Sequence, residues 1–218
     1  MQAKAYKGMG MEGGIAEWYA KITRKDLDEV RILARRIAAG LSDGNSILET
    51  APGPGYLAIE LAKLGNFKVT GLDISKTFVK IAGKNAAEAG VGVDFRHGDA
   101  AHMPFAEQTF DQIVCRAAFK NFSQPALALN EMWRVLRPGG QALVIDLRKD
   151  TPLESIDAYI SRMNTGKMNS FMMRWTFRLL LLRRAYTRED FQRFIAQSGF
   201  RSSEIREKAL GFEVVLVK

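Results

Sequence analysis

The sequence is poor in the residues that build disulfide-bonded or metal-based scaffolds, with one cysteine and two histidines among 218 residues. Cys115 excludes an internal disulfide, and its place at the end of an apolar run predicts a packed core thiol. We expect no metal site, because no ligand spacing is present. No apolar run reaches the length of a membrane span, and no secretory signal is seen, so a cytoplasmic protein is expected.

Acidic residues are missing from one long segment. The net charge is +8, and between Ala158 and Arg188 there are seven basic residues and no acidic one. This segment also holds four of the nine methionines. Phe171, Trp175 and Leu179 lie on one stripe of a helix, so a basic amphipathic helix is predicted here.

Three interpretations of this segment remain open. It can be a core-packing helix with a solvated basic face, a lid over an apolar or planar substrate, or a contact with a membrane surface or a second subunit. A nucleic acid partner is disfavoured, because most of the excess charge lies in this one segment. The chain also lacks an Asn/Asp-Pro-Pro-Tyr-type motif and an appended RNA-binding module.

The stretch 47–55, Ile-Leu-Glu-Thr-Ala-Pro-Gly-Pro-Gly, joins a predicted strand to a predicted helix through a glycine turn. Such a turn lets a nucleotide-like ligand lie against bare backbone at the edge of a parallel sheet. The pattern from Gly53 to Ala58 also fits a dinucleotide fingerprint, with Asp73 at a distance suited to a ribose. Glu49, however, has no function in pyrophosphate binding. It suits a ligand that carries an ammonium group.

Two further acids follow the next strands of the chain. Asp73 ends the run 67–72, and Asp99 follows a third strand predicted over 91–96. Because ligands of open α/β sheets bind at the carboxyl ends of the strands, these acids are expected at one edge with Glu49. They match the ammonium side, the ribose and the base of a single ligand. This pattern favours S-adenosylmethionine over a nicotinamide dinucleotide.

The chain resembles the class I S-adenosylmethionine-dependent methyltransferases, in the small-molecule branch that includes the ubiquinone and menaquinone biosynthesis enzymes. The matching motifs are residues 48–55, 70–75, 98–105, 110–114 and 131–140. One departure is Ala51, where the family usually has glycine. The resemblance implies S-adenosylmethionine as cofactor and S-adenosylhomocysteine as product. It implies these cofactor contacts: Tyr19, Glu49, Ala51, Pro52, Gly53, Gly55, Asp73, Ile74, Asp99, Ala100 and Arg116.

The resemblance also implies one α/β domain with a Rossmann-like sheet of seven strands in the order 3-2-1-4-5-7-6. The last strand is antiparallel, and helices cover both faces. Within residues 1–218 we expect four parts: an N-terminal helical cap segment (1–40), a cofactor-binding core (41–147), a basic, Met-rich lid insertion (151–188) and a C-terminal helix with a strand pair (189–218).

The residues of the acceptor side are less sharply indicated. In quinone-biosynthesis C-methyltransferases the stretch after the fourth strand ends in Leu-Arg-Asn, and Lys120 and Asn121 match the last two positions in part. Both residues also suit a surface turn or a helix cap. His102 is either a wall residue beside the cofactor or a base, with no acid partner identifiable in the sequence.

The sequence therefore predicts an enzyme that transfers a methyl group from S-adenosylmethionine to a small, apolar or aromatic acceptor. The acceptor atom is left open among oxygen, carbon, nitrogen and sulfur. Two alternatives are an RNA-modifying methyltransferase and a non-catalytic, cofactor-binding partner subunit. A membrane-surface or homodimer contact would use residues 158–188.

Overall fold

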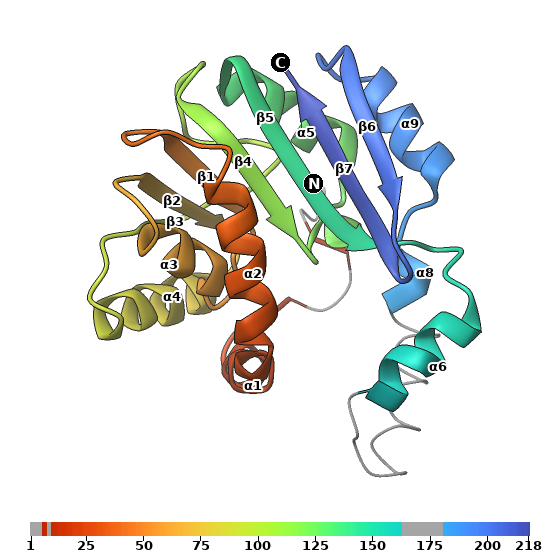
Figure 1. Ribbon diagram of the computed structural model, residues 1–218, viewed down its shortest axis with the longest axis horizontal. Coiled ribbons are helices and arrows are strands. Elements are labelled where there is room, and N and C mark those ends of the chain that lie inside the picture. The colour runs from red at the N-terminus through yellow and green to blue at the C-terminus, as the bar shows by residue number, and fades with distance from the viewer. Residues whose placement is uncertain (1–5, 8–9, 163–180) are drawn as a thin grey trace, which may run out of the picture.

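Seven strands form one sheet in the computed structural model, which describes residues 6–7, 10–162 and 181–218. The central strands are largely buried, whereas the two edge strands are mostly polar and exposed. The strand order is β3-β2-β1-β4-β5-β7-β6 (Figure 1). Only β7 runs against its two neighbours within this sheet. The bounds are β1 (Ser46–Thr50), β2 (Lys68–Asp73), β3 (Asp94–His97), β4 (Phe110–Arg116), β5 (Leu136–Leu147), β6 (Ser202–Glu207) and β7 (Gly211–Val217). The predicted order and the antiparallel last strand are confirmed.

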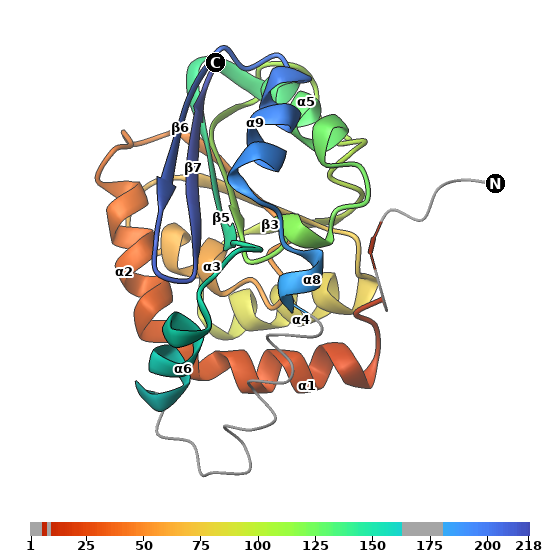
Figure 2. The ribbon, with the colours of Figure 1, turned by 90° about the vertical axis from the view of Figure 1, so that its right-hand side faces the viewer.

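Helices cover both faces of the sheet, as predicted. The longer helices and short helical turns are α1 (Gly14–Thr23), η1 (Arg24–Asp26), α2 (Leu27–Ala38), α3 (Tyr56–Ala62), α4 (Lys76–Glu88), η2 (Phe119–Asn121), α5 (Pro125–Val135), α6 (Leu153–Arg162), α8 (Leu182–Arg184) and α9 (Arg188–Ala196). Figure 2 shows α2 and α3 on one side of the sheet and α5 and α9 on the other. The carboxyl ends of the parallel strands point toward α1.

Each face has its own apolar core. Val30, Leu57 and Val69 belong to the core under α2 and α3. On the other face, Phe119, Phe191 and Phe212 belong to a cluster in which Phe119 stacks on Phe191 at a centroid distance of 5.2 Å. Cys115 is fully buried, and burial raises the pKa of its thiol to about 12, as expected of a core thiol.

Element boundaries differ from the sequence-based expectations where local interactions intervene. The helical segment expected within residues 1–40 is interrupted at η1. The Thr23 hydroxyl donates to the Tyr19 carbonyl (2.8 Å) just before this interruption, a contact that bends helices. β3 begins at Asp94 instead of Val91. α9 begins earlier than predicted, at Arg188, because Thr187 and Asp190 form a capping box.

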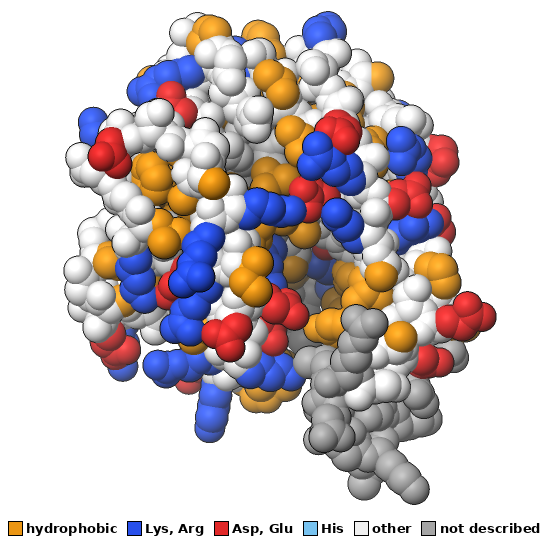
Figure 3. Space-filling view, in the orientation of Figure 1, with side chains coloured by type: hydrophobic (Ala, Val, Ile, Leu, Met, Phe, Trp, Pro, Cys, Tyr) orange, Lys and Arg blue, Asp and Glu red, His pale blue; other side chains and the backbone are white. Residues whose placement is uncertain are grey.

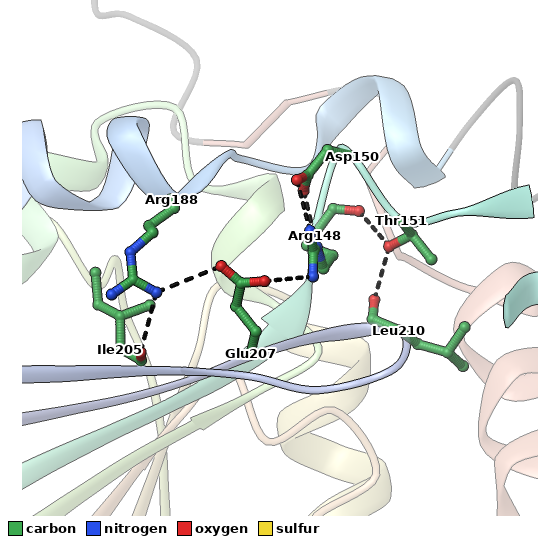
Figure 4. Close-up of polar contacts among 7 residues, drawn as sticks. All are labelled: Arg148, Asp150, Thr151, Arg188, Ile205, Glu207 and Leu210. Atoms are coloured by element: carbon green, nitrogen blue, oxygen red, sulfur yellow. Dashed lines mark hydrogen bonds and ion pairs between the residues drawn. The ribbon is translucent and has the colours of Figure 1, made fainter.

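The two ends of the segment 151–188 are tied to each other and to the β6–β7 hairpin (Figure 4). The Lys149 amide donates to the Tyr186 carbonyl (3.1 Å). The Arg148 guanidinium bonds Glu207 (2.7 Å), which Arg188 also approaches (3.4 Å). The segment therefore leaves and rejoins the fold at one place. Most of the predicted amphipathic helix, residues 171–180, lies outside the described residues.

Candidate functional site

The turn after β1 has a backbone that suits close ligand approach. Ala51, Gly53 and Gly55 all have positive φ angles of 54°, 55° and 78°. A Cβ added at Gly53 would meet no atom within 4 Å, whereas one at Gly55 would lie 2.6 Å from the Phe95 ring and 2.8 Å from the Ala82 Cβ. Glycine at Gly55 lets the turn pack against Phe95 of β3 and Ala82 of α4, and Gly53 leaves bare backbone. The left-handed angle at Ala51 explains why the family prefers glycine there.

Glu49 lies buried under the same turn, with 4% of its surface exposed. Its Oε2 accepts a hydrogen bond from the Ala58 amide in the first turn of α3 (2.8 Å). Burial raises the pKa of Glu49 to about 8, and the nearby charge of Arg116 lowers it only in part. Burial therefore favours the protonated form of this carboxyl group, which the Ala58 amide and Arg116 oppose in part.

Asp73 is linked directly to the glycine turn. Its Oδ2 accepts from the Gly53 amide (2.9 Å), and its Oδ1 accepts from the Ser75 amide (2.8 Å). Burial is the main cause that raises the pKa of Asp73. Each carboxylate oxygen has a second lone pair, so the group can still accept hydrogen bonds from a ligand. Ile74 follows with 36% of its surface exposed.

Asp99 lies next to His102 after β3. The Asp99 Oδ1 accepts from the Ala101 amide (2.9 Å), and its Oδ2 is 3.5 Å from the His102 Nδ1. His102 thus has an acid partner that the sequence alone did not identify. Its side chain is two-thirds exposed, while Asp99 and Ala100 are half-buried.

Arg116 and Tyr19 border the site from two further elements. Arg116 ends β4 and lies 3.8 Å from Glu29 of α2. Tyr19 lies within α1, and its ring meets Phe78 edge-on at 5.8 Å. Burial raises the pKa of Tyr19, an effect that Arg116 opposes.

After β4, the structure brings Lys120 against an acid near the end of β5. The Lys120 Nζ donates to Asp146 Oδ1 (2.9 Å) and to the Ala117 carbonyl (2.5 Å). The Lys120 amide donates to Asp146 Oδ2 (2.7 Å). Both side chains are buried, so Lys120 is not a surface-turn residue. Ala117, at the start of this loop, has a positive φ of 59°. The backbone carbonyl of Asn121 accepts a hydrogen bond from the Lys7 amide (2.8 Å).

Sequence reasoning missed Asp146 and the N-terminal residues around the site. Asp146 sits within an apolar strand, and its partner is 26 positions away, so no local pattern marks it. Tyr6 pairs with Phe122, and the Lys7 ammonium contacts the Tyr186 hydroxyl. Glu12 accepts from the amides of Lys76 and Thr77 (2.9 and 3.0 Å) at the start of α4. Such N-terminal acid caps are visible only once the elements are placed.

Figure 3 shows the molecule hollowed between α2 and the β5–β7 strands. A cavity of about 510 Å³ on this face lies toward the amino ends of the strands, and none of the three predicted cofactor acids lines it. Both acids that line it are already paired, Glu213 with Arg36 (2.9 Å) and Asp111 with Arg137 (2.6 Å). Across the described residues, no group of three or more His, Cys, Asp and Glu side chains is arranged to hold a metal ion. No described helix is long and apolar enough to cross a membrane.

Comparison with known proteins agrees with this geometry. A methyltransferase-domain family model matches residues 48–144, which run from β1 into β5. The demethylmenaquinone methyltransferase of Chlorobaculum parvum is 29% identical over 183 residues, covering 80% of this chain and 74% of that protein. The ubiquinone/menaquinone biosynthesis C-methyltransferase UbiE of Bdellovibrio bacteriovorus is 37% identical over 111 residues, but the match covers only 50% of this chain and 46% of that protein.

Solved structures extend the similarity beyond the core. A candidate S-adenosyl-L-methionine-dependent methyltransferase from Methanococcus maripaludis superposes with a TM-score of 0.75 and 25% identity, covering 99% of this chain and 97% of that one. An Aquifex aeolicus methyltransferase shares the fold, with a TM-score of 0.65. With the strand order, the glycine turn and the three acids, these matches show that the chain belongs to the class I S-adenosylmethionine-dependent methyltransferases.

Proposed function

We propose that this methyltransferase acts on a small aromatic acceptor of the hydroquinone class and methylates it at a ring carbon. The observation that carries the proposal is the similarity to a demethylmenaquinone methyltransferase over 183 residues, well beyond the cofactor-binding core. Aromatic core side chains lie next to the proposed acceptor residue Lys120: Phe119 precedes it in η2 and meets Tyr186 at 6.0 Å.

Each of the three acids is proposed to contact a different part of S-adenosylmethionine. Glu49 would face the ammonium side, Asp73 the ribose hydroxyls and Asp99 the adenine amino group. The structure itself supports such a ligand. Two buried acids, Glu49 and Asp73, flank a turn in which the space beside Gly53 is free of other atoms. When bound, S-adenosylmethionine supplies a methyl group on a sulfonium. The turn residues Ala51, Pro52, Gly53 and Gly55, with Tyr19, Ile74, Ala100 and Arg116, complete the proposed contacts.

The acceptor side would act through charge and position. In carbon methylation of a hydroquinone, a ring carbon would form a bond to the methyl group as the sulfonium–methyl bond breaks, and the ring would then release its proton to water. A nearby cation favours the anionic oxygen that activates the ring. Lys120 is the proposed cation, held by Asp146, and Asn121 is proposed to orient the acceptor beside it. For His102 we propose a wall position beside the cofactor. Exclusion of water by the surrounding aromatic rings would strengthen these interactions.

We also propose a function for each of the four parts of the chain. Residues 1–40 would cap the cofactor, 41–147 would hold it, 151–188 would cover the acceptor, and 189–218 would complete the sheet. Contact of residues 158–188 with a membrane surface or a second copy stays a prediction, as does the cytoplasmic location.

The test is methyl transfer from radiolabelled S-adenosylmethionine to a panel of demethylated naphthoquinols, phenols, thiols and total RNA. We expect labelled product with the quinols, at a ring carbon by mass spectrometry. Label in phenols or thiols alone would refute the acceptor class, and label in RNA would support an RNA-modifying enzyme. Cofactor binding without transfer to any member would support a partner subunit.

A further inference from the structure

Helix α1 carries an apolar stripe that the fold leaves exposed. Ile15, Trp18 and Ile22 are spaced three and four residues apart, so they lie on one side of the helix. Their exposed fractions are 40%, 62% and 38%. The opposite side does the packing: Ala16 and Ala20 are buried there. The fold therefore does not need the outward stripe.

Exposed lysines lie near this stripe in α1, in η1 and in the neighbouring helix α4. Lys21 and Lys25 are exposed beside it, and Lys76, Lys80 and Lys84 form an exposed row at four-residue spacing along α4. The two helices lie side by side (Figure 2), joined by the Tyr19–Phe78 contact and by a hydrogen bond from the Gly13 amide to Thr77 (3.0 Å).

Most of these lysines are available for an external partner. Among the ion pairs of the described residues, none includes Lys21, Lys25, Lys76 or Lys80, while Lys84 lies 3.8 Å from Glu88. Glu17 is the one acid within α1 itself. The surface is thus an exposed indole and two isoleucines edged by cations.

We propose that this α1–α4 surface, formed by Ile15, Trp18, Ile22 and the flanking lysines, docks on an anionic lipid bilayer. Tryptophan favours the membrane–water interface, and lysines can extend their charge to the headgroups while their stems cover apolar surface. A helix with an apolar stripe and basic edges lies in the plane of such an interface. A two-fold contact between copies would bring the lysine rows together, so charge favours the bilayer as the occupant.

The location links this surface to the methyltransferase site. α1 lies on the side toward which the carboxyl ends of the parallel strands point (Figure 1). Its inner face reaches the site through Tyr19, and the Tyr56 hydroxyl donates to the Ala20 carbonyl (2.8 Å). A bilayer on the outer face would bring the site close to lipid-dissolved molecules. The docking itself does not depend on which acceptor is methylated.

The test is flotation of the full chain with vesicles of phosphatidylcholine, alone or mixed with phosphatidylglycerol. We expect binding to the mixed vesicles only, weakening as salt rises. Trp18→Ser should lower the affinity at least about tenfold. A Lys76→Gln/Lys80→Gln double variant should weaken binding and reduce its salt dependence, which keeps the test available if the tryptophan variant folds poorly.

The matched control is Leu64→Ser, because Leu64 is 42% exposed at the end of α3, away from this surface. It should bind like the unaltered protein. Absence of binding to anionic vesicles, or equal binding by the Trp18 and lysine variants, overturns the proposal. Dimerisation measured by light scattering that Trp18→Ser abolishes, without vesicle binding, assigns the surface to a second copy and also overturns it.

Discussion

Asp146 binds Lys120 twice, through its Oδ2 to the backbone amide (2.7 Å) and through its Oδ1 to the ammonium group (2.9 Å). These contacts fix η2 against the end of β5. They also hold a buried cation after β4, where the acceptor is proposed to bind.

Asp146→Asn should therefore destabilise the protein. It leaves the Lys120 ammonium buried without a counter-ion, and loss of one partner of a buried pair costs about 3–5 kcal/mol. Urea unfolding measures this loss. The double variant Asp146→Asn/Lys120→Met should recover part of it, because it removes the stranded charge. A change below about 0.5 kcal/mol in Asp146→Asn would show that the pair does not hold the loop.

The pH dependence of stability should carry a contribution from Glu49. Burial raises its pKa from 4.5 to about 8, so between these values the folded state holds a proton that the unfolded state has lost. The free energy of unfolding from this group must then fall as pH rises, by up to about 1.4 kcal/mol per unit. Asp73, whose pKa burial also raises, adds a slope of the same sign.

Glu49→Gln removes the Glu49 contribution, so its unfolding free energy should fall less steeply across this range than that of the unaltered protein. The variant should also be the more stable one near pH 8. Urea unfolding at several pH values provides the measurement. Identical slopes in both proteins would mean that Glu49 is ionised in the folded state throughout.

Gly55→Ala should lower the unfolding free energy by more than about 2 kcal/mol. The new Cβ would overlap Phe95 and Ala82, and the φ of 78° disfavours any side chain. Ala51→Gly is the matched change in the same turn, since Ala51 already has a positive φ. It should be neutral or stabilise by up to about 1 kcal/mol. Thermal unfolding would contradict this reasoning if both variants lost stability equally.

The three acids were predictable from the sequence because each rests on a local signal, whereas the sheet order was predicted only through the family resemblance. Glu49, Asp73 and Asp99 follow apolar runs, and the glycines mark the turn between them. Lys120 was selected by resemblance, but its burial was not foreseen, because its counter-ion lies 26 residues further along the chain. The caps that Glu12 provides to α4 join residues 64 and 65 positions apart. Contacts of that kind depend on tertiary placement, which periodicity does not reveal.

The interruption between α1 and α2 is a second feature that periodicity did not predict. The apolar spacing from Ile15 to Ile37 fits one long helix, yet η1 separates two. The turn lets α1 lie across the carboxyl edge of the sheet while α2 packs on its face. Helical periodicity predicts that a residue is buried, but it does not predict which element the residue packs against.

Calorimetric titration of S-adenosylmethionine, with NAD as the comparison ligand, tests the central claim most directly. The unaltered protein should bind S-adenosylmethionine and its demethylated product but not NAD. Asp73→Ala should lose nearly all of this affinity, because the carboxylate is proposed to hold the ribose and it orders the Gly53 amide. Circular dichroism checks that the variant remains folded. Unchanged affinity in a folded Asp73→Ala, or binding of NAD in place of S-adenosylmethionine, would contradict the account.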